Sequence, residues 1–453
     1  MQKKGKKEIL RGAVWLGLGA FLSKVLGAFY RVPLTNLIGG YGLGLYQTVF
    51  PVYALLLDFS GAGVPSAVSG LIASSEDKER RAHEYFNTSI RLLLIFGAIA
   101  SILTFAFSKP LSFMQGNPAV YLAYRSLSPA ILAVSIICAF RGYFQGLMDM
   151  KPTAISQVVE QAVKLIFGLA LAKLFLPNIP KAVAGATFAI TLSEFFALLI
   201  LYVIYRKRRK IFPLTLAFNN ENFRARSKEI IKATIPITLI SVAIPLSHVI
   251  DSFLIVNVLG AYRSDATVLY GLLSGVCLTV INLPVSVCYG ISTVTIPAVS
   301  RLKDEESVRK NSRRTLLLTL IISLPCALFC LIFAPFIINF LFRSLSLQEK
   351  TIAINLLRLT SPCVILLSML QTENAVLIGK KERYKPLFSL IIGVLIKTML
   401  NFILLNNPKI NIYGGGVSLI ACYFTACLIN LIMIFKLKVK NGSSRACRRE
   451  YAS

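Results

Sequence analysis

The chain contains an internal repeat. Residues 7–39 and residues 228–260 align without a gap, and each segment opens with Lys-Glu-Ile and closes with two aliphatic residues and a glycine. A further match follows in the same order, Ala67–Ser69 with Ala298–Ser300. Two copies of one sequence pattern must satisfy the same packing rules, so the chain is expected to fold as two similar halves.

The halves are strongly apolar. Hydrophobic residues make up 55% of the 453 residues, the mean hydropathy is +0.69, and apolar runs near the length of a membrane-spanning helix recur from end to end. We therefore predict an all-α polytopic membrane protein with about 12 transmembrane helices in two six-helix lobes. Because six spans are an even number, both copies enter the membrane in the same direction, as in a parallel internal repeat. The predicted spans are residues 9–37, 43–73, 87–108, 119–147, 152–176, 182–205, 229–259, 267–300, 314–342, 351–379, 386–406 and 411–436.

The positive charge indicates how the chain lies in the membrane. The formal net charge is +29, and the lysines and arginines gather in alternate connections, including both ends of the chain. This asymmetry follows the positive-inside rule and places both termini in the cytoplasm, with the protein in the cell membrane. The basic clusters are expected to contact anionic lipids and not nucleic acid. The predicted domains are an N-terminal lobe at 1–205, a basic cytoplasmic linker at 206–228, a C-terminal lobe at 229–436 and a basic cytoplasmic tail at 437–453.

The sequence gives little indication of a metal site, a cofactor or enzymatic catalysis. The nine cysteines include no C-x-x-C pair, so neither a metal site nor a cofactor is expected. The short outward connections carry no paired carboxylates for acid–base catalysis, and no Walker A motif is present, so an enzyme is not expected.

Charged residues inside the predicted spans are the candidate functional residues, because each is costly in the bilayer unless it faces a partner or water. Lys24 and Arg31 lie at i, i+7 of the first span, nearly on one face and about 10 Å apart along the helix axis. Asp58 lies near the middle of the second span, at about the depth of Lys24. Two interpretations remain open: a structural Lys24–Asp58 pair, or a water-filled cavity in which the cations receive an anion.

The fourth and fifth spans add further charges. Glu160 and Lys164 lie at i, i+4, the geometry of an intrahelical salt bridge. Arg141 lies in the cytoplasmic third of the fourth span, within reach of the interface, and Glu194 lies in the sixth. The N-terminal lobe thus concentrates cations at depth.

The C-terminal lobe has a different set. Asp251 lies in the seventh span with His248 one turn before it, while Lys397 and Asn401 lie at i, i+4 of the eleventh. A fixed buried Asp251–Lys397 ion pair and a conformational switch that depends on that pair both fit the pattern.

Two segments resemble a known family. Residues Arg141–Gly146 (RGYFQG), followed by Lys151–Thr153 and Ser156–Gln161, are similar to the region around the fourth and fifth helices of stage V sporulation protein B and its relatives. Ser23–Gly27 (SKVLG) is similar to the Ser-Arg-Val-Leu-Gly of MurJ-type lipid II flippases, with Lys24 at the position of an arginine. Both groups belong to the multidrug/oligosaccharidyl-lipid/polysaccharide (MOP) superfamily. The chain departs from the pattern at Tyr30, where the family has its next arginine, and it has about twelve predicted spans where these relatives commonly have fourteen helices.

The resemblance implies a V-shaped two-lobe exporter with a central cationic cavity. Such a protein moves a polyprenyl-pyrophosphate-linked saccharide, a cell-wall or polysaccharide precursor such as lipid II, across the cytoplasmic membrane by alternating access. The partners implied are this lipid-linked oligosaccharide, membrane lipids and a coupling ion, H⁺ or Na⁺. Relatives can bind sodium between an acid of the seventh helix and polar residues of the eleventh. The expected substrate-binding residues are Lys24, Arg31, Asp58, Arg141 and Lys164, and the expected coupling residues are Asp251, Lys397 and Asn401. The alternatives are a cation-coupled multidrug antiporter and a non-transporting membrane scaffold for envelope or spore-coat assembly.

Overall fold

The computed structural model describes residues 2–73, 75, 78–208, 221–300, 302, 304–380, 382 and 384–436. Every regular element in these ranges is a helix, which confirms the predicted all-α fold. Much of the basic linker and all of the predicted tail lie outside the described residues.

The first two predicted spans form one long run of helix with a break. Helix α1 (Gln2–Leu57) is interrupted at Gly39, where φ is 70° and ψ is −176°. A positive φ is readily adopted only by a residue without a Cβ atom, so glycine permits the change of direction at this position. The break falls between the predicted spans 9–37 and 43–73. A π-helical turn, η1 (Asp58–Ala62), then leads into α2 (Gly63–Ala73).

Ten helical segments among the described residues are long and apolar enough to cross a membrane, and each overlaps one of the last ten predicted spans. The protein is therefore a multi-pass membrane protein. Its remaining elements are α3 (Lys78–Ala106), α4 (Ser108–Met114), η2 (Pro118–Val120), α5 (Tyr121–Gly146), α6 (Lys151–Leu174), α7 (Ile179–Arg208), α8 (Glu221–Gly260), α9 (Ala266–Tyr270), η3 (Gly271–Cys277), α10 (Leu278–Ser300), α11 (Glu305–Ile332), α12 (Ala334–Leu341), α13 (Leu347–Thr360), α14 (Pro362–Gly379), α15 (Lys385–Leu405) and α16 (Tyr413–Lys436).

Internal contacts divide the chain into two compact units. The first unit contains residues 1–279, 335–354 and 401–412, and the second contains residues 280–334, 355–400 and 413–453. Helix α8 thus packs with the N-terminal helices. The lobe boundaries at 205 and 229 remain a prediction, because a compact unit is defined by contacts and a transporter lobe by how it moves.

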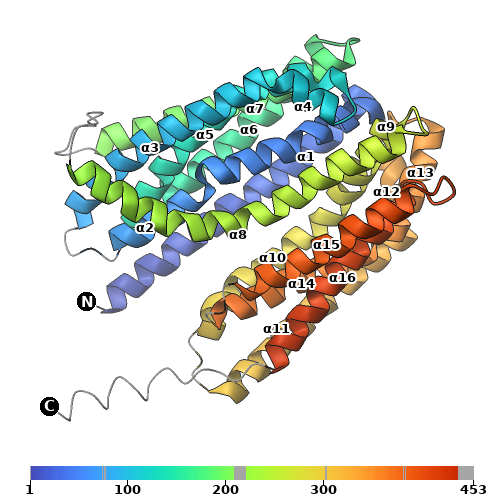
Figure 1. Cartoon of the computed structure of the whole chain (residues 1–453). Coiled ribbons are helices and arrows are strands. Elements are labelled where there is room, and N and C mark those ends of the chain that lie inside the picture. The colour runs from blue at the N-terminus through green and yellow to red at the C-terminus, as the bar shows by residue number, and fades with distance from the viewer. Residues whose placement is uncertain are drawn as a thin grey trace. The chain divides into compact units, whose positions relative to one another are not determined.

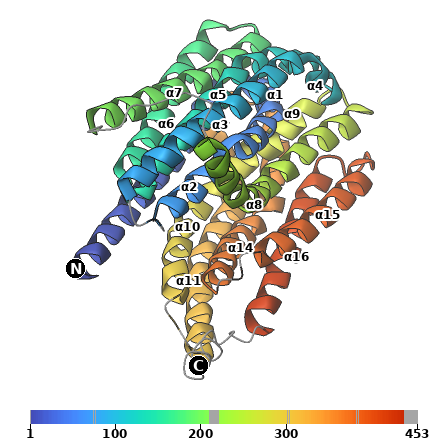
Figure 2. The same ribbon diagram turned by 60° about the vertical axis from the view of Figure 1, so that its left-hand side comes forward.

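The first unit is a bundle in which α7 packs against both α5 and α6, and α1 packs against α6 (Figures 1 and 2). Its core on the α1 side is built around Leu34, Tyr124 and Ile131, all buried. A second core around Phe86, Phe140 and Tyr205 joins α3, α5 and α7. These contacts fix α1, α5, α6 and α7 side by side, so polar groups on their inner faces must satisfy one another.

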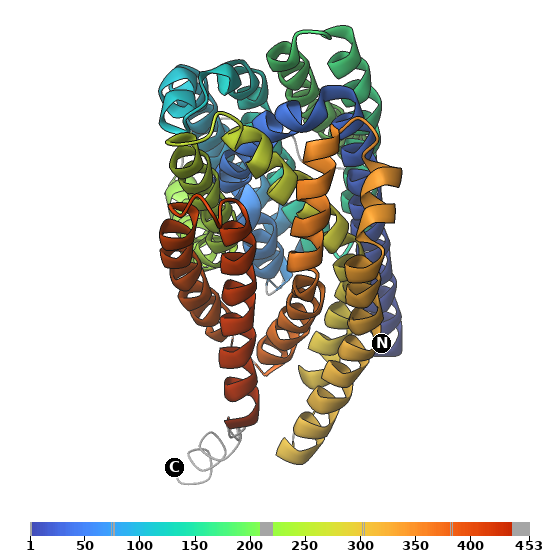
Figure 3. The same ribbon diagram turned by 90° about the vertical axis from the view of Figure 1, so that its right-hand side faces the viewer.

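In the second unit, α14 packs between α11 and α16, which are drawn in yellow to red in Figure 3. The buried residues Val299, Val376 and Ile434 join α10, α14 and α16 at one end of this bundle. Leu370 and Ala426 join α14 and α16 further along.

Candidate functional site

Arg31 is held inside the first unit without a carboxylate partner. Its Nη1 donates a hydrogen bond of 3.2 Å to Oγ1 of Thr279, and its guanidinium lies 5.5 Å from the centroid of the Phe50 ring. Among the described residues, no carboxylate oxygen lies within 4.0 Å of the Arg31 guanidinium nitrogens. A guanidinium held by a hydroxyl and a ring face keeps most of its N–H donors available for an anion.

Lys164 is the second such cation. Its Nζ lies 5.8 Å from the centroid of the buried Tyr30 ring, and Gly168 on the same helix leaves room for that ring. Lys164 interacts electrostatically with Glu160, Arg31 and Glu194. Helices α1 and α6 therefore bring the two cations predicted from separate spans into one electrostatic cluster.

Arg141 is tied into the same region by an ion pair between helices. Its Nη2 lies 3.1 Å from Oε2 of Glu160, and its Nε donates to Oγ of Ser156 at 3.2 Å. The i, i+4 spacing of Glu160 and Lys164 allowed an intrahelical salt bridge, but the ion pair that Glu160 forms is with Arg141, while Lys164 interacts with Glu160 only at longer range. The α5–α6 packing brings a guanidinium to Glu160 and leaves Lys164 over Tyr30.

The acid Glu194 and several aromatic residues complete the cluster. The hydroxyl of Tyr53 donates to Oε1 of Glu194 at 3.3 Å, and Glu194 is 5% exposed. Tyr46 and Phe50 are stacked with 5.9 Å between ring centroids, and Phe50 lies 6.2 Å from Tyr53. This aromatic wall was not predicted from the sequence, although residues 46, 50 and 53 follow a helical i, i+4, i+7 spacing that could have indicated it.

Two predicted residues are less fully described. The side chain of Lys24 lies outside the described residues, so the predicted Lys24–Asp58 pair stays a prediction. Asp58 is half-buried in the π-helical turn η1 and interacts electrostatically with Cys138 of α5, which also interacts with Arg141, Glu160 and Glu194. π-Helical turns are rare and are frequent at functional sites.

The predicted coupling residues are found partly together. Nδ2 of Asn401 donates to Oδ1 of Asp251 at 3.1 Å, so the predicted proximity of α8 and the end of α15 is present. Nδ1 of His248 lies 4.0 Å from Oδ2 of Asp251. Lys397 is 2% exposed in α15, one turn before Asn401. The contribution of these residues to ion coupling stays a prediction.

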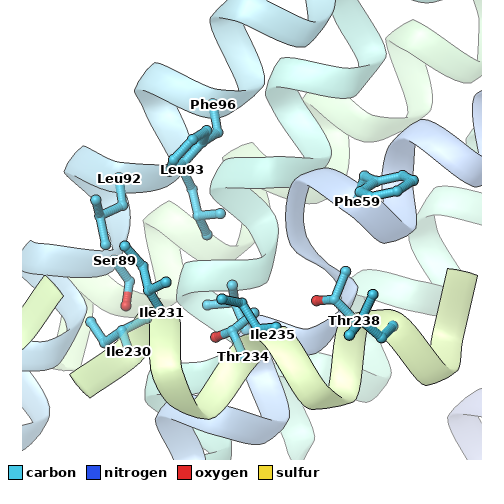
Figure 4. A pocket seen from close by; sticks show the side chains of 12 residues that line it. Phe59, Ser89, Leu92, Leu93, Phe96, Ile230, Ile231, Thr234, Ile235 and Thr238 are labelled. Atoms are coloured by element: carbon cyan, nitrogen blue, oxygen red, sulfur yellow. The ribbon is translucent and has the colours of Figure 1, made fainter. Parts of the chain in front are cut away.

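A separate hollow in the first unit is apolar. Its volume is about 350 Å³, and its lining comes from η1, α2, α3 and α8. Figure 4 shows Phe59 and Phe96 on two of its sides, with Ile231 and Ile235 on α8. This hollow lacks charged lining residues, so it suits a hydrocarbon and gives no charge-assisted contact to a phosphate.

Comparisons with known proteins agree on the family. Residues 9–303 match the model of the polysaccharide biosynthesis protein family, and residues 236–403 match the MatE model. The chain is 27% identical to the lipid II flippase MurJ of Bacillus subtilis (strain 168) over 94% of its own length and 82% of that protein. It is 26% identical to the stage V sporulation protein B of the same organism, over 95% of its length and 84% of the relative.

The fold is also found among solved structures. An inward-facing multidrug resistance MATE family transporter of the MOP superfamily matches with a TM-score of 0.76 and 18% identity, covering 93% of this chain and 96% of the other. The match confirms the predicted MATE-like fold. Since the family model covers more than half of the chain, the protein belongs to the polysaccharide biosynthesis protein family.

Proposed function

We propose that the protein is a flippase that moves a polyprenyl-pyrophosphate-linked saccharide across the cytoplasmic membrane by alternating access. The observation that carries the proposal is the pair of cations Arg31 and Lys164, which lie over the rings of Phe50 and Tyr30 and form no ion pair among the described residues. Cations within membrane spans are costly unless an opposite charge or water compensates them, so two cations that form no described ion pair favour an anionic ligand.

The chemistry of the cluster suits a pyrophosphate-sugar headgroup. Arg31 can give paired N–H donors to phosphate oxygens, and Lys164 can neutralise a second charge as a point cation. Lys24 of α1 would add a third cation, and Asp58 would take sugar hydroxyls as an acceptor. The aromatic rings of Tyr46 and Phe50 offer apolar surfaces to the faces of sugar rings.

Arg141 has a different position in this proposal. Its guanidinium is bound by Glu160 and Ser156, so Arg141 orients α6 and thereby Lys164. Arg141 can contact the headgroup only if Glu160 leaves it.

The names of two relatives support the choice of substrate. The names of the relatives from Bacillus subtilis include a lipid II flippase and a sporulation protein, so a peptidoglycan precursor is the first substrate to test. Cells depleted of their own lipid II flippase should grow when this chain is expressed. Labelled precursor should then reach the outer leaflet, whereas the Arg31→Ala/Lys164→Ala variant should support neither growth nor outward movement. If the wild type moves no lipid-linked saccharide in this assay or in vesicles that contain other polyprenyl-linked sugars, the proposal is wrong.

A cation-coupled multidrug antiporter is the second candidate, favoured by the MatE match and by the acid Asp251 hydrogen-bonded to Asn401. It predicts that expression raises the efflux of cationic dyes, and that Asp251→Asn abolishes the effect. The flippase proposal predicts no dye efflux.

Coupling of export to H⁺ or Na⁺ is proposed to involve Asp251, Asn401 and Lys397. In reconstituted vesicles, Lys397→Ala should make export respond to sodium or become uncoupled while the protein stays folded. A variant that only loses thermal stability would instead indicate a fixed structural role for Lys397.

A further inference from the structure

The apolar hollow of the first unit contains three hydroxyl groups without a hydrogen-bond partner. Ser89 of α3 and Thr234 and Thr238 of α8 line it, and their oxygens are buried and unpaired among the described residues (Figure 4). A helical hydroxyl can donate to the carbonyl oxygen four residues earlier, as Thr88 does to Glu84 at 2.8 Å. A buried hydroxyl that makes no such bond costs free energy. Three of them around one hollow favour a ligand that carries oxygen acceptors.

The other walls of the hollow are hydrocarbon and can be reached from outside the bundle. The lining side chains Phe59, Phe96, Ile231 and Ile235 are between 38% and 59% exposed. The surroundings of such side chains in a membrane span are lipid chains. A volume of about 350 Å³ equals that of roughly a dozen water-sized groups, so the hollow suits one segment of a hydrocarbon chain.

Two lysines of α8 lie between the hollow and the cytoplasmic end of the helix. Lys228 and Lys232 are exposed and share a helix face with Ile231 and Ile235, at i, i+4 and i+3, i+7. Lys232 precedes Ile235 by three residues, about 4.5 Å along the axis. Neither lysine forms an ion pair with a carboxylate of the described residues within 4.0 Å. The lysines therefore place two positive charges beside the hollow, at the end of α8 that the charge distribution assigns to the cytoplasm.

The acids next to these lysines already have partners. Oε2 of Glu229 accepts a hydrogen bond of 2.6 Å from the hydroxyl of Tyr85 and lies 3.2 Å from Nη1 of Arg226. Oε2 of Glu84 lies 3.2 Å from Nη2 of Arg226. These contacts join the cytoplasmic ends of α3 and α8. They leave the charges of Lys228 and Lys232 for an anion from outside the protein.

We propose that the hollow binds an anionic diacyl phospholipid of the cytoplasmic leaflet. One acyl chain fills the hollow, the hydroxyls donate to its ester oxygens, and the phosphate lies against Lys228 and Lys232. A polyprenyl chain fits less well, because it carries no oxygen along its hydrocarbon and leaves the hydroxyls unpaired. The bound lipid packs against both α3 and α8 and so stabilises their contact. The lipid site is separate from the headgroup cluster and does not depend on the proposed function.

The preference for an anionic lipid is tested on the purified protein in mixed micelles. Native mass spectrometry counts the retained lipid when phosphatidylglycerol and phosphatidylcholine with the same acyl chains compete. A lysine near an anionic lipid contributes about 1 kcal/mol, so the wild type should prefer phosphatidylglycerol roughly 10- to 30-fold. Lys228→Ser/Lys232→Ser should lose the preference. The matched control Lys310→Ser/Arg314→Ser removes two exposed cations with the same spacing from α11 and should keep it. Equal retention of the two lipids by the wild type, or equal loss in the two variants, would overturn the proposal.

The place of binding is tested by fluorescence, because the chain contains a single tryptophan, Trp15. In a Trp15→Phe background, Phe96→Trp puts a reporter in the hollow, and Phe424→Trp puts one on an exposed part of α16 outside it. In nanodiscs, phosphatidylglycerol with brominated chains should quench the reporter at position 96 several-fold more than brominated phosphatidylcholine does. The reporter at position 424 should be quenched equally by both.

Replacing Lys228 and Lys232 by serine should remove the difference at position 96 without changing the quenching at position 424. A difference that is absent in the unmutated hollow, or that persists without the lysines, would contradict the proposal. Unlabelled polyprenyl phosphate is then added as a competitor. If it relieves the quenching at a lower concentration than unlabelled phosphatidylglycerol does, the hollow belongs to a polyprenyl chain and the assignment to a phospholipid is wrong.

Discussion

At the scale of single residues, the sign of the charges and the partner that each one has decide what the cluster can bind. Arg31 and Lys164 are held by a hydroxyl and by aromatic faces, while Arg141 is held by a carboxylate. The first two cations therefore have donors to offer to a ligand. The third is part of the scaffold that positions them.

Replacing Arg31 should weaken binding of the headgroup. Hydrogen bonds to charged groups contribute about 1.5–3 kcal/mol, so Arg31→Ala should bind a pyrophosphate-linked saccharide roughly 10- to 100-fold more weakly. Arg31→Lys should recover part of the loss, because the charge remains and the paired donors do not. Binding to protein in nanodiscs measures this. Arg125→Ala, which removes a cation stacked on Phe105 and Tyr121, is the control expected to bind normally, and normal binding by Arg31→Ala would contradict the assignment.

Breaking the Arg141–Glu160 pair should destabilise the first unit. The two side chains are only 15% and 18% exposed, and removing one partner of a buried pair typically costs about 3–5 kcal/mol. The melting temperature of Glu160→Gln should fall clearly, and Arg141→Met/Glu160→Met should recover much of the loss because no charge is left unpaired. Glu382→Gln breaks a more exposed pair with Lys385 and should change stability by less than about 1 kcal/mol. A normal melting temperature for Glu160→Gln would show that water or another group satisfies Arg141.

At the scale of elements, close backbone contacts determine how α1 lies against its neighbours in the first unit. A Cβ atom on Gly271 of η3 would lie 2.6 Å from the backbone nitrogen of Gly44 in α1. The neighbouring atoms are backbone and cannot rotate away. This contact helps to position the segment of α1 that carries the aromatic wall.

Adding a methyl group at Gly271 should therefore separate α1 from η3. Overpacking of this kind typically costs about 1–3 kcal/mol, so Gly271→Ala should lower the melting temperature and weaken headgroup binding together. Gly70→Ala in α2 is the matched control, because nothing lies within 4 Å of the added methyl group and alanine favours a helix. The control should be as stable as the wild type or slightly more stable. Equal stability of the two variants would show that the α1–η3 contact can relax.

At the scale of the whole molecule, the distribution of lysine and arginine predicts that both termini and the linker lie in the cytoplasm. A cysteine introduced at position 217 should be protected from an impermeant thiol reagent in intact cells and should react after permeabilisation. The described native cysteines are buried or partly buried, so they should react little with the reagent. The experiment uses a variant in which any cysteine that still reacts is replaced. Reaction at position 217 in intact cells would invert the predicted topology.

The sequence by itself determined the class of fold. Apolar runs of about 20 residues must be helices in a bilayer, where every backbone group needs an internal partner, so the all-α fold and ten of the spans were predictable. The break in α1 was also predictable from local sequence. Glycine readily adopts the positive φ that Gly39 has, and other residues rarely do. The cations Arg31 and Lys164 were identifiable because charges in apolar spans are rare.

Only the tertiary structure decided which partner each charge has. Glu160 lies one turn from Lys164 in the sequence, yet it pairs with Arg141 of a neighbouring helix. Tyr53 and Glu194 are 141 positions apart and are joined by a hydrogen bond. Sequence spacing reports neighbours along one helix, whereas contacts between helices depend on how side chains of both surfaces interlock.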